Sequence, residues 1–383
     1  MENTIGFMCN INKSQKPIHS LGPNQITRAV HISRVLKDFG SKLLIYSPIY
    51  IDLELKTVPG FYVEGNDFIF IDELPIPIIN CNWTVGTKTL HREEGIGYEK
   101  FKVWSRDNGI QIYVPYTFVE IALDKYCTHS LISGFDQELC PYTELFERTK
   151  FQLQDFFTMG DIIFLKPRKG GRGNRIISLK KQNRNSYSLS FYTKKQKQEY
   201  NFNSLEDVLK EIEKIITNRN YIVQKGIETQ RYNGHSFDVR VLMLHDGKDW
   251  HCIHQARIGA KDYDISNVSQ GGIEMVLEEL LLRVYGKKHK KIINEVGKLS
   301  FSLADYLESK YPSQLIELAF DFVLDKTGNI YLVEINTKPG LYLQILTDVF
   351  NIQPEEREVF TEFIEPHIYY MGKFLQTKLE EIN

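Results

Sequence analysis

The sequence has few cysteines, and no two of them have a metal-binding or redox spacing. Five cysteines are scattered over 383 residues. An odd number of dispersed cysteines is typical of buried, reduced thiols. The sequence therefore excludes a disulfide-stapled secreted domain and favours a cytoplasmic protein.

Long apolar segments and a surplus of charge of one sign are also missing. No run of about 18 apolar residues occurs, so no membrane-spanning helix is predicted. The first residues, Met1-Glu2-Asn3-Thr4-Ile5, lack the basic start of a secretory signal. Lysine and arginine number 47 against 49 aspartates and glutamates, which gives a net charge of -2. This balance predicts neither nucleic acid nor a membrane as partner.

Length and composition are sufficient for two or three domains, because 42% of the residues are hydrophobic and a domain takes roughly 100–200 residues. Apolar spacing predicts a helix over Asn24–Phe39, between an apolar run at Ile5–Cys9 and a strand over Lys42–Tyr46. With a further strand over Phe68–Ile71, this order predicts a βαβ unit and a parallel sheet. The stretch Pro75–Val114 gives no clear pattern.

The pattern changes after about residue 118. One helix is predicted over Val119–Leu131, a strand over Asp161–Lys166, and a helix over Leu205–Thr217 capped by Ser204. Further along, the sequence predicts two hairpins (Val239–Leu244 with His251–Arg257, and Leu318–Leu324 with Ile330–Ile335) and helices over Glu274–Tyr285, Lys290–Tyr311 and Pro354–Leu379.

The last predicted hairpin carries acidic residues inside apolar strands. Asp321 lies in the first strand, and Glu334 and Asn336 lie two residues apart in the second, so these two share a face. A carboxylate removed from water needs a partner. Three oxygen-bearing side chains on one surface suit magnesium, and the alternative is that the acids pair with buried lysine or arginine.

A glycine-rich segment follows the strand that ends at Lys166. Gly170, Gly171 and Gly173 free the backbone to direct N–H groups at a phosphate, and Lys166 would add a point charge. The Walker pattern is absent. The alternative is an ordinary glycine-rich hairpin.

Two further polar segments are candidates for binding. At Gln224, Lys225 and Ile227 an apolar strand enters a polar linker, which would offer hydrogen-bonding groups to an adenine edge or is a plain strand end. Arginines on internal strands need an anionic partner. Arg240 and Arg257 would hold phosphate, or would form internal ion pairs such as Asp238 with Arg257.

The order of these motifs resembles the ATP-grasp superfamily over residues 120–350. The upstream segments Asp124-Lys125 and Pro141-Tyr142-Thr143 also resemble it. The segments Asp238-Val239-Arg240 and Glu334-Ile335-Asn336 are most similar to its endospore coat-associated YheC/YheD-type branch. The resemblance implies an α/β chain with an N-terminal pre-ATP-grasp domain (residues 1–118), a central α+β lobe (119–225) and a C-terminal lobe (226–383).

The resemblance also implies roles for individual residues. The cofactors would be ATP and one or two Mg²⁺ ions, with Asp321, Glu334 and Asn336 as metal ligands. Lys125 and Lys166 would contact the phosphates, Gly170, Gly171 and Gly173 would cover them, Gln224, Lys225 and Ile227 would frame the adenine, and Asp238 would lie near the ribose. Arg240, Arg257 and Asn267 would face the reacting phosphoryl group. Relatives often have a glycine where this chain has Arg175.

The implied reaction is phosphoryl transfer to a carboxylate, followed by attack of an amine on the acyl phosphate. The partners would be a carboxylate substrate and an amine nucleophile, each a small molecule or a peptide, and a homodimer is allowed. Two alternatives stay open: a phosphotransferase of the same fold, or a non-catalytic spore-coat or scaffold protein. The expected location is the cytoplasm, with spore association allowed.

Overall fold

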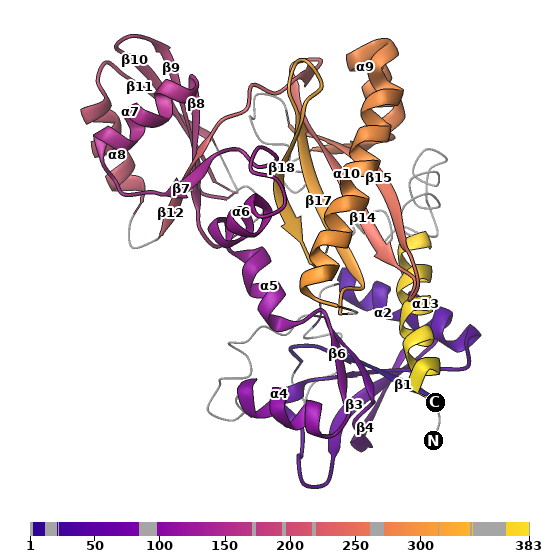
Figure 1. Ribbon diagram of the computed structural model, residues 1–383. Helices are drawn as coiled ribbons and strands as arrows, with labels where there is room; N and C mark the ends of the chain where they lie inside the picture. Colours follow the sequence, from indigo (N-terminus) through magenta and orange to yellow (C-terminus); the bar gives the residue numbers. More distant parts are fainter. Residues whose placement is uncertain are drawn as a thin grey trace.

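A computed structural model describes residues 3–11, 21, 23–83, 98–170, 174–193, 197–216, 220–260, 272–312, 314–337, 339 and 365–382. Within these ranges the chain forms three separate sheets, which Figure 1 shows around a common centre. None of the helices in this part of the chain is long and apolar enough to cross a membrane. The predicted domain boundaries stay predictions.

The N-terminal sheet has the strand order β4-β3-β2-β1-β5-β6. Its strands are β1 (Thr4–Met8), β2 (Lys42–Tyr46), β3 (Thr57–Glu64), β4 (Asp67–Pro75), β5 (Ile79–Asn82) and β6 (Gln111–Tyr113). Helix α2 (Pro23–Asp38) joins β1 to its parallel neighbour β2, which confirms the predicted βαβ unit. The parallel prediction is wrong for β3 and β4, which pair antiparallel, because short turns join only antiparallel neighbours.

The central sheet is antiparallel and has the order β11-β10-β9-β8-β12-β7. Its strands are β7 (Thr143–Leu145), β8 (Ile162–Pro167), β9 (Ile176–Asn183), β10 (Ser186–Tyr192), β11 (Lys197–Phe202) and β12 (Tyr221–Lys225). Helices α7 (Lys150–Met159) and α8 (Leu205–Ile215) bury apolar side chains against it. As predicted, Ser204 caps α8 and accepts a bond from the Asp207 N–H at 3.2 Å.

The C-terminal sheet is also antiparallel and has the order β16-β15-β14-β17-β18, with β13 beside β14. The strands are β13 (Arg231–Tyr232), β14 (His235–His245), β15 (Trp250–Ile258), β16 (Ile273–Met275), β17 (Glu317–Leu324) and β18 (Ile330–Asn336). Both predicted hairpins are confirmed. Helices α9 (Leu277–Tyr285) and α10 (His289–Lys310) cover one face, linked by the short helix η3 (Gly286–Lys288).

The opposite face of the C-terminal sheet is divided in two. Leu242, Leu244 and Ala319 share a core with the N-terminal sheet. Two residues from Leu242 along β14, the same face carries Arg240 opposite Asp321. The apolar part therefore holds the N-terminal sheet in place, and the polar part remains as the floor of a site.

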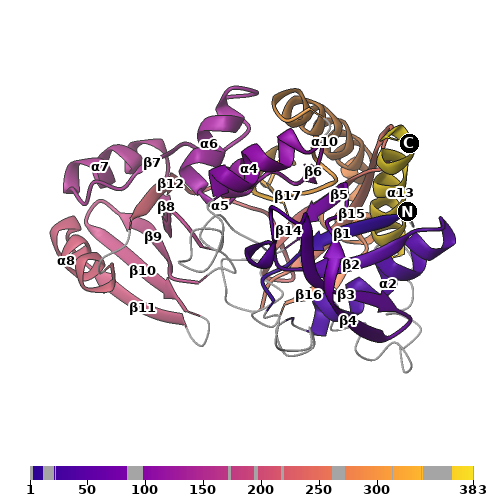
Figure 2. The same ribbon diagram turned by 90° about the horizontal axis from the view of Figure 1, so that it is seen from below.

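Helix α13 (Glu365–Ile382) joins distant parts of the chain. It packs on α2 and also contacts β14 and β5, and Figures 1 and 2 show it beside the N-terminal strands. Met371 and Phe374 belong to the same core as Ile5 and Phe7. The helix predicted over Pro354–Leu379 begins at Glu365 in the described part, and residues 354–364 lie outside it.

The structure corrects the single helix predicted over Val119–Leu131. The chain forms α5 (Tyr116–Leu123) and α6 (Lys125–Ser133), which are separated at Asp124. The Asp124 side chain accepts bonds from the Tyr126 and Cys127 N–H groups, so it caps a new helix instead of continuing the old one. This break fixes the position of Lys125 in the first turn.

Two other segments differ from the predictions. Glu274 was expected to begin a helix, but it lies in β16, because residues 273–275 pair with β15, and α9 begins at Leu277. The unassigned stretch after Pro75 contains β5, α4 (Tyr98–Asp107) and β6, and residues 84–97 lie outside the described part. The helical turn η1 (Pro48–Tyr50) follows β2.

Candidate functional site

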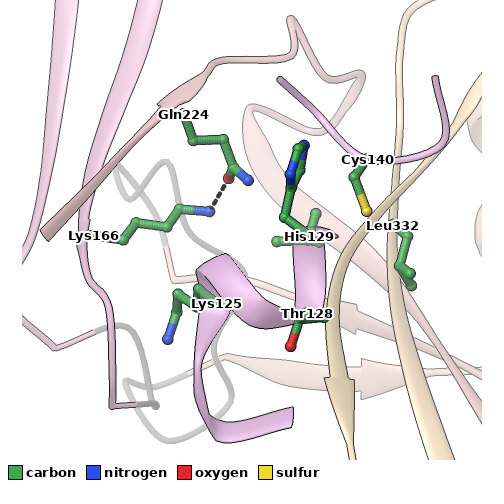
Figure 3. Close-up of a pocket in the computed structure, with 8 residues that line it drawn as sticks. Lys125, Thr128, His129, Cys140, Lys166, Gln224 and Leu332 are labelled. Atoms are coloured by element: carbon green, nitrogen blue, oxygen red, sulfur yellow. Dashed lines mark hydrogen bonds between the residues drawn. The ribbon is translucent and has the colours of Figure 1, made fainter. Parts of the chain in front are cut away.

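A pocket lies where α6, β8 and β12 of the central region face β18 of the C-terminal sheet (Figure 3). Its lining residues are Lys125, Thr128, His129, Cys140, Lys166, Gln224, Leu332 and Val333. Residues from far apart in the sequence therefore meet here, among them both lysines and the glutamine singled out from the sequence.

Lys166 lies at the end of β8 and points to Gln224, as the dashed line in Figure 3 shows. Its Nζ donates to Gln224 Oε1 at 2.6 Å, and Gln224 Nε2 donates to Thr143 Oγ1 at 2.8 Å. Burial lowers the pKa of Lys166 to about 8, and Lys125 acts in the same direction while Glu334 opposes it. The Lys166 ammonium group is thus a partly desolvated cation that donates to one amide oxygen.

Lys125 is tied to the start of the glycine-rich segment. Its Nζ donates to the Gly170 carbonyl, and its backbone N–H donates to the Arg168 carbonyl at 2.9 Å. Arg168 Nε in turn lies 2.7 Å from Asp124 Oδ2. These contacts hold the first turn of α6 against the strand end that carries Lys166.

The glycine-rich segment is described only in part. Gly170 has φ +137°, which favours glycine, whereas Gly171 and Gly173 lie outside the described residues. Arg175 has φ +63°. Its N–H donates to the Tyr192 carbonyl at 2.7 Å. Arg175 therefore adopts the backbone conformation that a glycine would have adopted without strain.

The polar floor consists of Asp238, Arg240, Arg257, Asp321, Glu334 and Asn336. Asp321 accepts two bonds from Arg240, both at 2.8 Å, and Arg257 lies 3.0 Å from it. Burial raises the pKa of Asp321, but the two arginines outweigh it and hold the pKa at about 2. This carboxylate is therefore ionised and paired with both arginines.

Arg257 joins the two acids of the floor. It donates to both carboxylate oxygens of Asp238, at 2.6 and 2.7 Å. Burial lowers the pKa of Arg257, but Asp238 and Asp321 together raise it above its usual value. The internal ion pair weighed from the sequence is present. Phosphate binding by Arg240 and Arg257, and a ribose contact of Asp238, stay predictions.

Glu334 differs from the other acids of the floor. It lies opposite Asp321 in the β17–β18 register and is partly buried. No hydrogen bond or ion pair joins its carboxylate to another described residue. Burial raises its pKa, Lys125 and the arginines lower it, and Asp321 raises it further. Asn336 donates to Asp321 at 3.3 Å, which brings the three predicted ligands together.

The donor set of this corner fits a hard divalent cation. No group of three histidine, cysteine, aspartate or glutamate side chains that could hold a metal occurs among the described residues. A cation would therefore use the carboxylates of Asp321 and Glu334 with the Asn336 amide, and would need oxygens from its own ligand. This is the manner in which Mg²⁺ is held together with a nucleotide.

Other predicted residues are placed less closely. The Lys225 N–H donates to the Tyr142 carbonyl at 2.9 Å, which ties the linker to the start of β7. Ile227 lies two residues further along the linker, and no contact of its side chain decides its role. Asn267 lies outside the described residues. Their roles stay predictions.

The sequence analysis missed five residues that line the pocket; two, Leu332 and Val333, are apolar, and the other three are Thr128, His129 and Cys140. Thr128 and His129 follow Lys125 by three and four positions, so they lie on the same side of α6. Figure 3 shows His129 between Gln224 and Cys140. Burial lowers the pKa of His129 and raises that of Cys140 to about 12, so both are neutral at pH 7. Helical spacing from Lys125 would have found two of the three.

Comparison with known proteins decides the family. The sequence model described as YheC/D like ATP-grasp matches residues 116–359, which is more than half of the chain. This chain belongs to the YheC/D-like ATP-grasp family. Its match includes α6, the glycine-rich segment and the whole polar floor.

Two curated relatives of this family member come from Bacillus subtilis (strain 168). Endospore coat-associated protein YheC is 25% identical over 209 residues, which are 54% of this chain and 55% of YheC. Endospore coat-associated protein YheD is 22% identical over 182 residues, which are 46% of this chain and 39% of YheD. The chain therefore spans about half the length of YheC, and less of YheD.

Solved structures show that the family member has the fold of ATP-grasp ligases over its whole length. D-alanyl-alanine synthetase A from Vibrio cholerae O1 biovar eltor str. N16961 matches with a TM-score of 0.55 at 12% identity, covering 100% of this chain and 99% of that one. D-cycloserine synthetase DcsG matches with a TM-score of 0.52 at 11% identity, covering 98% and 100%. At these identities the likeness shows the fold alone.

Proposed function

We propose that the protein is an ATP- and Mg²⁺-dependent carboxylate–amine ligase that releases ADP and phosphate. The observation that carries the proposal is the meeting of two lysines on one lobe with a carboxylate of the other. Lys125 and Lys166 lie near Glu334, and the Glu334 carboxylate forms no hydrogen bond or ion pair with another described residue. Such an arrangement suits a polyphosphate with a metal ion between the lobes.

The metal would be held by Asp321, Glu334 and Asn336. Bound Mg²⁺ would supply positive charge to the phosphate oxygens of ATP. Asp321 would keep its arginine partners at 2.8 and 3.0 Å, and Glu334 would gain the partner that it lacks among the described residues. Burial is the first cause of the raised pKa of Glu334, and a bound cation would favour its anionic form.

The protein's own residues would orient and neutralise the reacting groups. Lys125 and Lys166 would hold the phosphates from the central lobe, and Arg240 and Arg257, already fixed by two carboxylates, would stabilise the oxygens of the transferred phosphoryl group. The carboxylate oxygen would attack the terminal phosphorus and release ADP. The amine nitrogen would then form the C–N bond, lose a proton and release phosphate.

Two of the proteins with similar solved structures are called synthetases, a name that agrees with this type of chemistry. The names of the curated relatives add a location, the endospore coat. We therefore propose an association with the spore coat for this chain too. Comparison of coat and cytosolic fractions with an antibody against the protein tests it.

Hydroxylamine trapping tests the proposed activity without knowledge of the natural amine. The protein, Mg²⁺–ATP and a panel of carboxylic acids are incubated with hydroxylamine, and hydroxamate and ADP are measured. At least one acid should give hydroxamate in amounts equal to the ADP released. ADP with a stable phosphorylated product would instead show a phosphotransferase, and the absence of ADP with every acid would contradict both activities.

A further inference from the structure

The polar floor continues to the edge of the C-terminal sheet that is opposite Glu334. Glu274 in β16 lies directly opposite Arg257 in β15, so the two side chains share a face. The strand order β16-β15-β14-β17-β18 thus places Glu274 at one edge and Glu334 at the other. With about 4.8 Å between neighbouring strands, β16 lies roughly 14 Å from β17.

The charges on this face do not balance at the Glu274 end. Asp321 is held by Arg240, and Asp238 is held by Arg257 at 2.6 and 2.7 Å. Two carboxylates remain outside these pairs. Glu334 faces the lysines of the central lobe, whereas Glu274 has the neutral Gln255 as its hydrogen-bond partner.

A purely structural role for Glu274, neutralising Arg257, does not fit these contacts. Arg257 already has Asp238 and, at 3.0 Å, Asp321. Glu274 is partly buried, and burial raises its pKa, while Gln255 and then Arg257 lower it. Arg240 acts in the same direction as Arg257, but both arginines are already held by Asp238 and Asp321. A carboxylate that is partly out of water and shares arginines held by two other acids is costly unless a further cation completes it.

The geometry points to Glu274 as a binding position for a cationic nitrogen of the acceptor, and we propose that the acceptor is a diamine or polyamine. The proposal rests on the ligase function above. Because β16 lies three strands from β17, Glu274 is too far from the Asp321–Glu334 pair to hold the nitrogen that reacts there. It would hold a second ammonium group, with the reacting nitrogen of the same molecule directed along the floor to Arg257 and Asp321.

Calorimetry with putrescine and spermidine tests the binding position without any turnover. The wild-type chain should bind at least one of them, and Glu274→Gln should bind it at least tenfold more weakly. Glu278→Gln is the matched control, because Glu278 lies four residues away on α9 with its side chain 62% exposed. Glu274→Asp, which keeps the charge, should bind better than Glu274→Gln. The neutral 1,4-butanediol should not bind.

Two results would overturn the proposal: no binding of either amine to the wild type, or equal affinities of wild type and Glu274→Gln. Circular dichroism of each variant separates loss of binding from loss of fold, and Glu274→Ala serves if Glu274→Gln does not fold. Hydroxamate formation tests the ligase function separately, because hydroxylamine has no second cation, and Glu278→Gln should retain it within twofold. Loss of hydroxamate in the wild type would thus contradict the ligase and leave the amine measurement to stand by itself.

Discussion

ATP binding should weaken as the pH rises from 7 to 9, because Lys166 loses its proton in this interval. Burial lowers the pKa of Lys166 to about 8. Roughly nine tenths of the side chain is then charged at pH 7 and one tenth at pH 9. If the phosphates bind only the charged form, the apparent Kd rises about tenfold over these two pH units. The direction of the change in Kd is fixed, because Lys166 loses its positive charge as the pH rises through its pKa.

Calorimetric titration of Mg²⁺–ATP at pH 7, 8 and 9 measures this effect. Repeating the pH 8 titration in buffers with different ionisation enthalpies counts protons, and binding should take up about half a proton at that pH. Lys166→Arg is the matched control, because a guanidinium stays charged throughout the range. Its affinity should change little with pH.

Two results would contradict the expected pH dependence of ATP affinity. A wild-type affinity that is constant from pH 7 to pH 9 would show that Lys166 keeps its proton or does not meet the phosphates. An equal slope in wild type and Lys166→Arg would assign the titration to another group. Either result would refute the inference that deprotonation of Lys166 weakens ATP binding.

Three further expectations follow from the contacts described above. Glu334→Gln should lower Mg²⁺-dependent ADP release at least a hundredfold while thermal unfolding shifts by less than about 2 °C, since no described residue bonds to this carboxylate; a large fall in the unfolding temperature would assign Glu334 a structural role. Asp321→Asn should lower the free energy of unfolding in urea by about 3 kcal/mol, because it leaves buried arginines without a full counter-charge; a change below 1 kcal/mol would refute this. Gly247→Ala should lower the free energy of unfolding by about 2 kcal/mol, since φ is +101° and a Cβ would lie 2.6 Å from Thr377. Gly234→Ala, where φ is +83° and a Cβ would meet open space, should lower it by about 1 kcal/mol. Equal losses in the two variants would contradict the clash with Thr377.

The hairpin with the predicted metal ligands was accessible from the sequence. Apolar residues surround Asp321 and Glu334, and the turn at Lys326-Thr327-Gly328-Asn329 sets the register as far as Phe322 opposite Leu332. A register shift between Phe322 and Asp321 then brings Asp321 opposite Glu334. The structure places these acids opposite each other, in strands whose bounds differ from the prediction by one residue at most. Local pattern was sufficient for the two strands and their turn, because they lie within a few residues of each other, but it did not reveal the register shift next to Asp321.

Contacts between distant segments were not accessible in the same way. The sequence suggested that Arg257 pairs with Asp238 or binds phosphate, but the second contact of Arg257, to Asp321, depends on the order of three strands. The strand β5 was missed because its alternate residues are Asn80 and Asn82, both fully buried. Asn80 accepts a bond from Tyr46 at 2.7 Å, a partner that no local pattern reveals.

The N-terminal core is complete only when α13 packs against it, so its folding waits for the synthesis of this helix. The helix fills a gap beside α2 in the N-terminal core, yet about 250 residues separate β6 from its first residue, Glu365. At about 5–20 residues per second, the ribosome needs roughly 10–50 s to make that interval. Throughout this time the N-terminal sheet of the nascent chain exposes the apolar surface that α13 will cover.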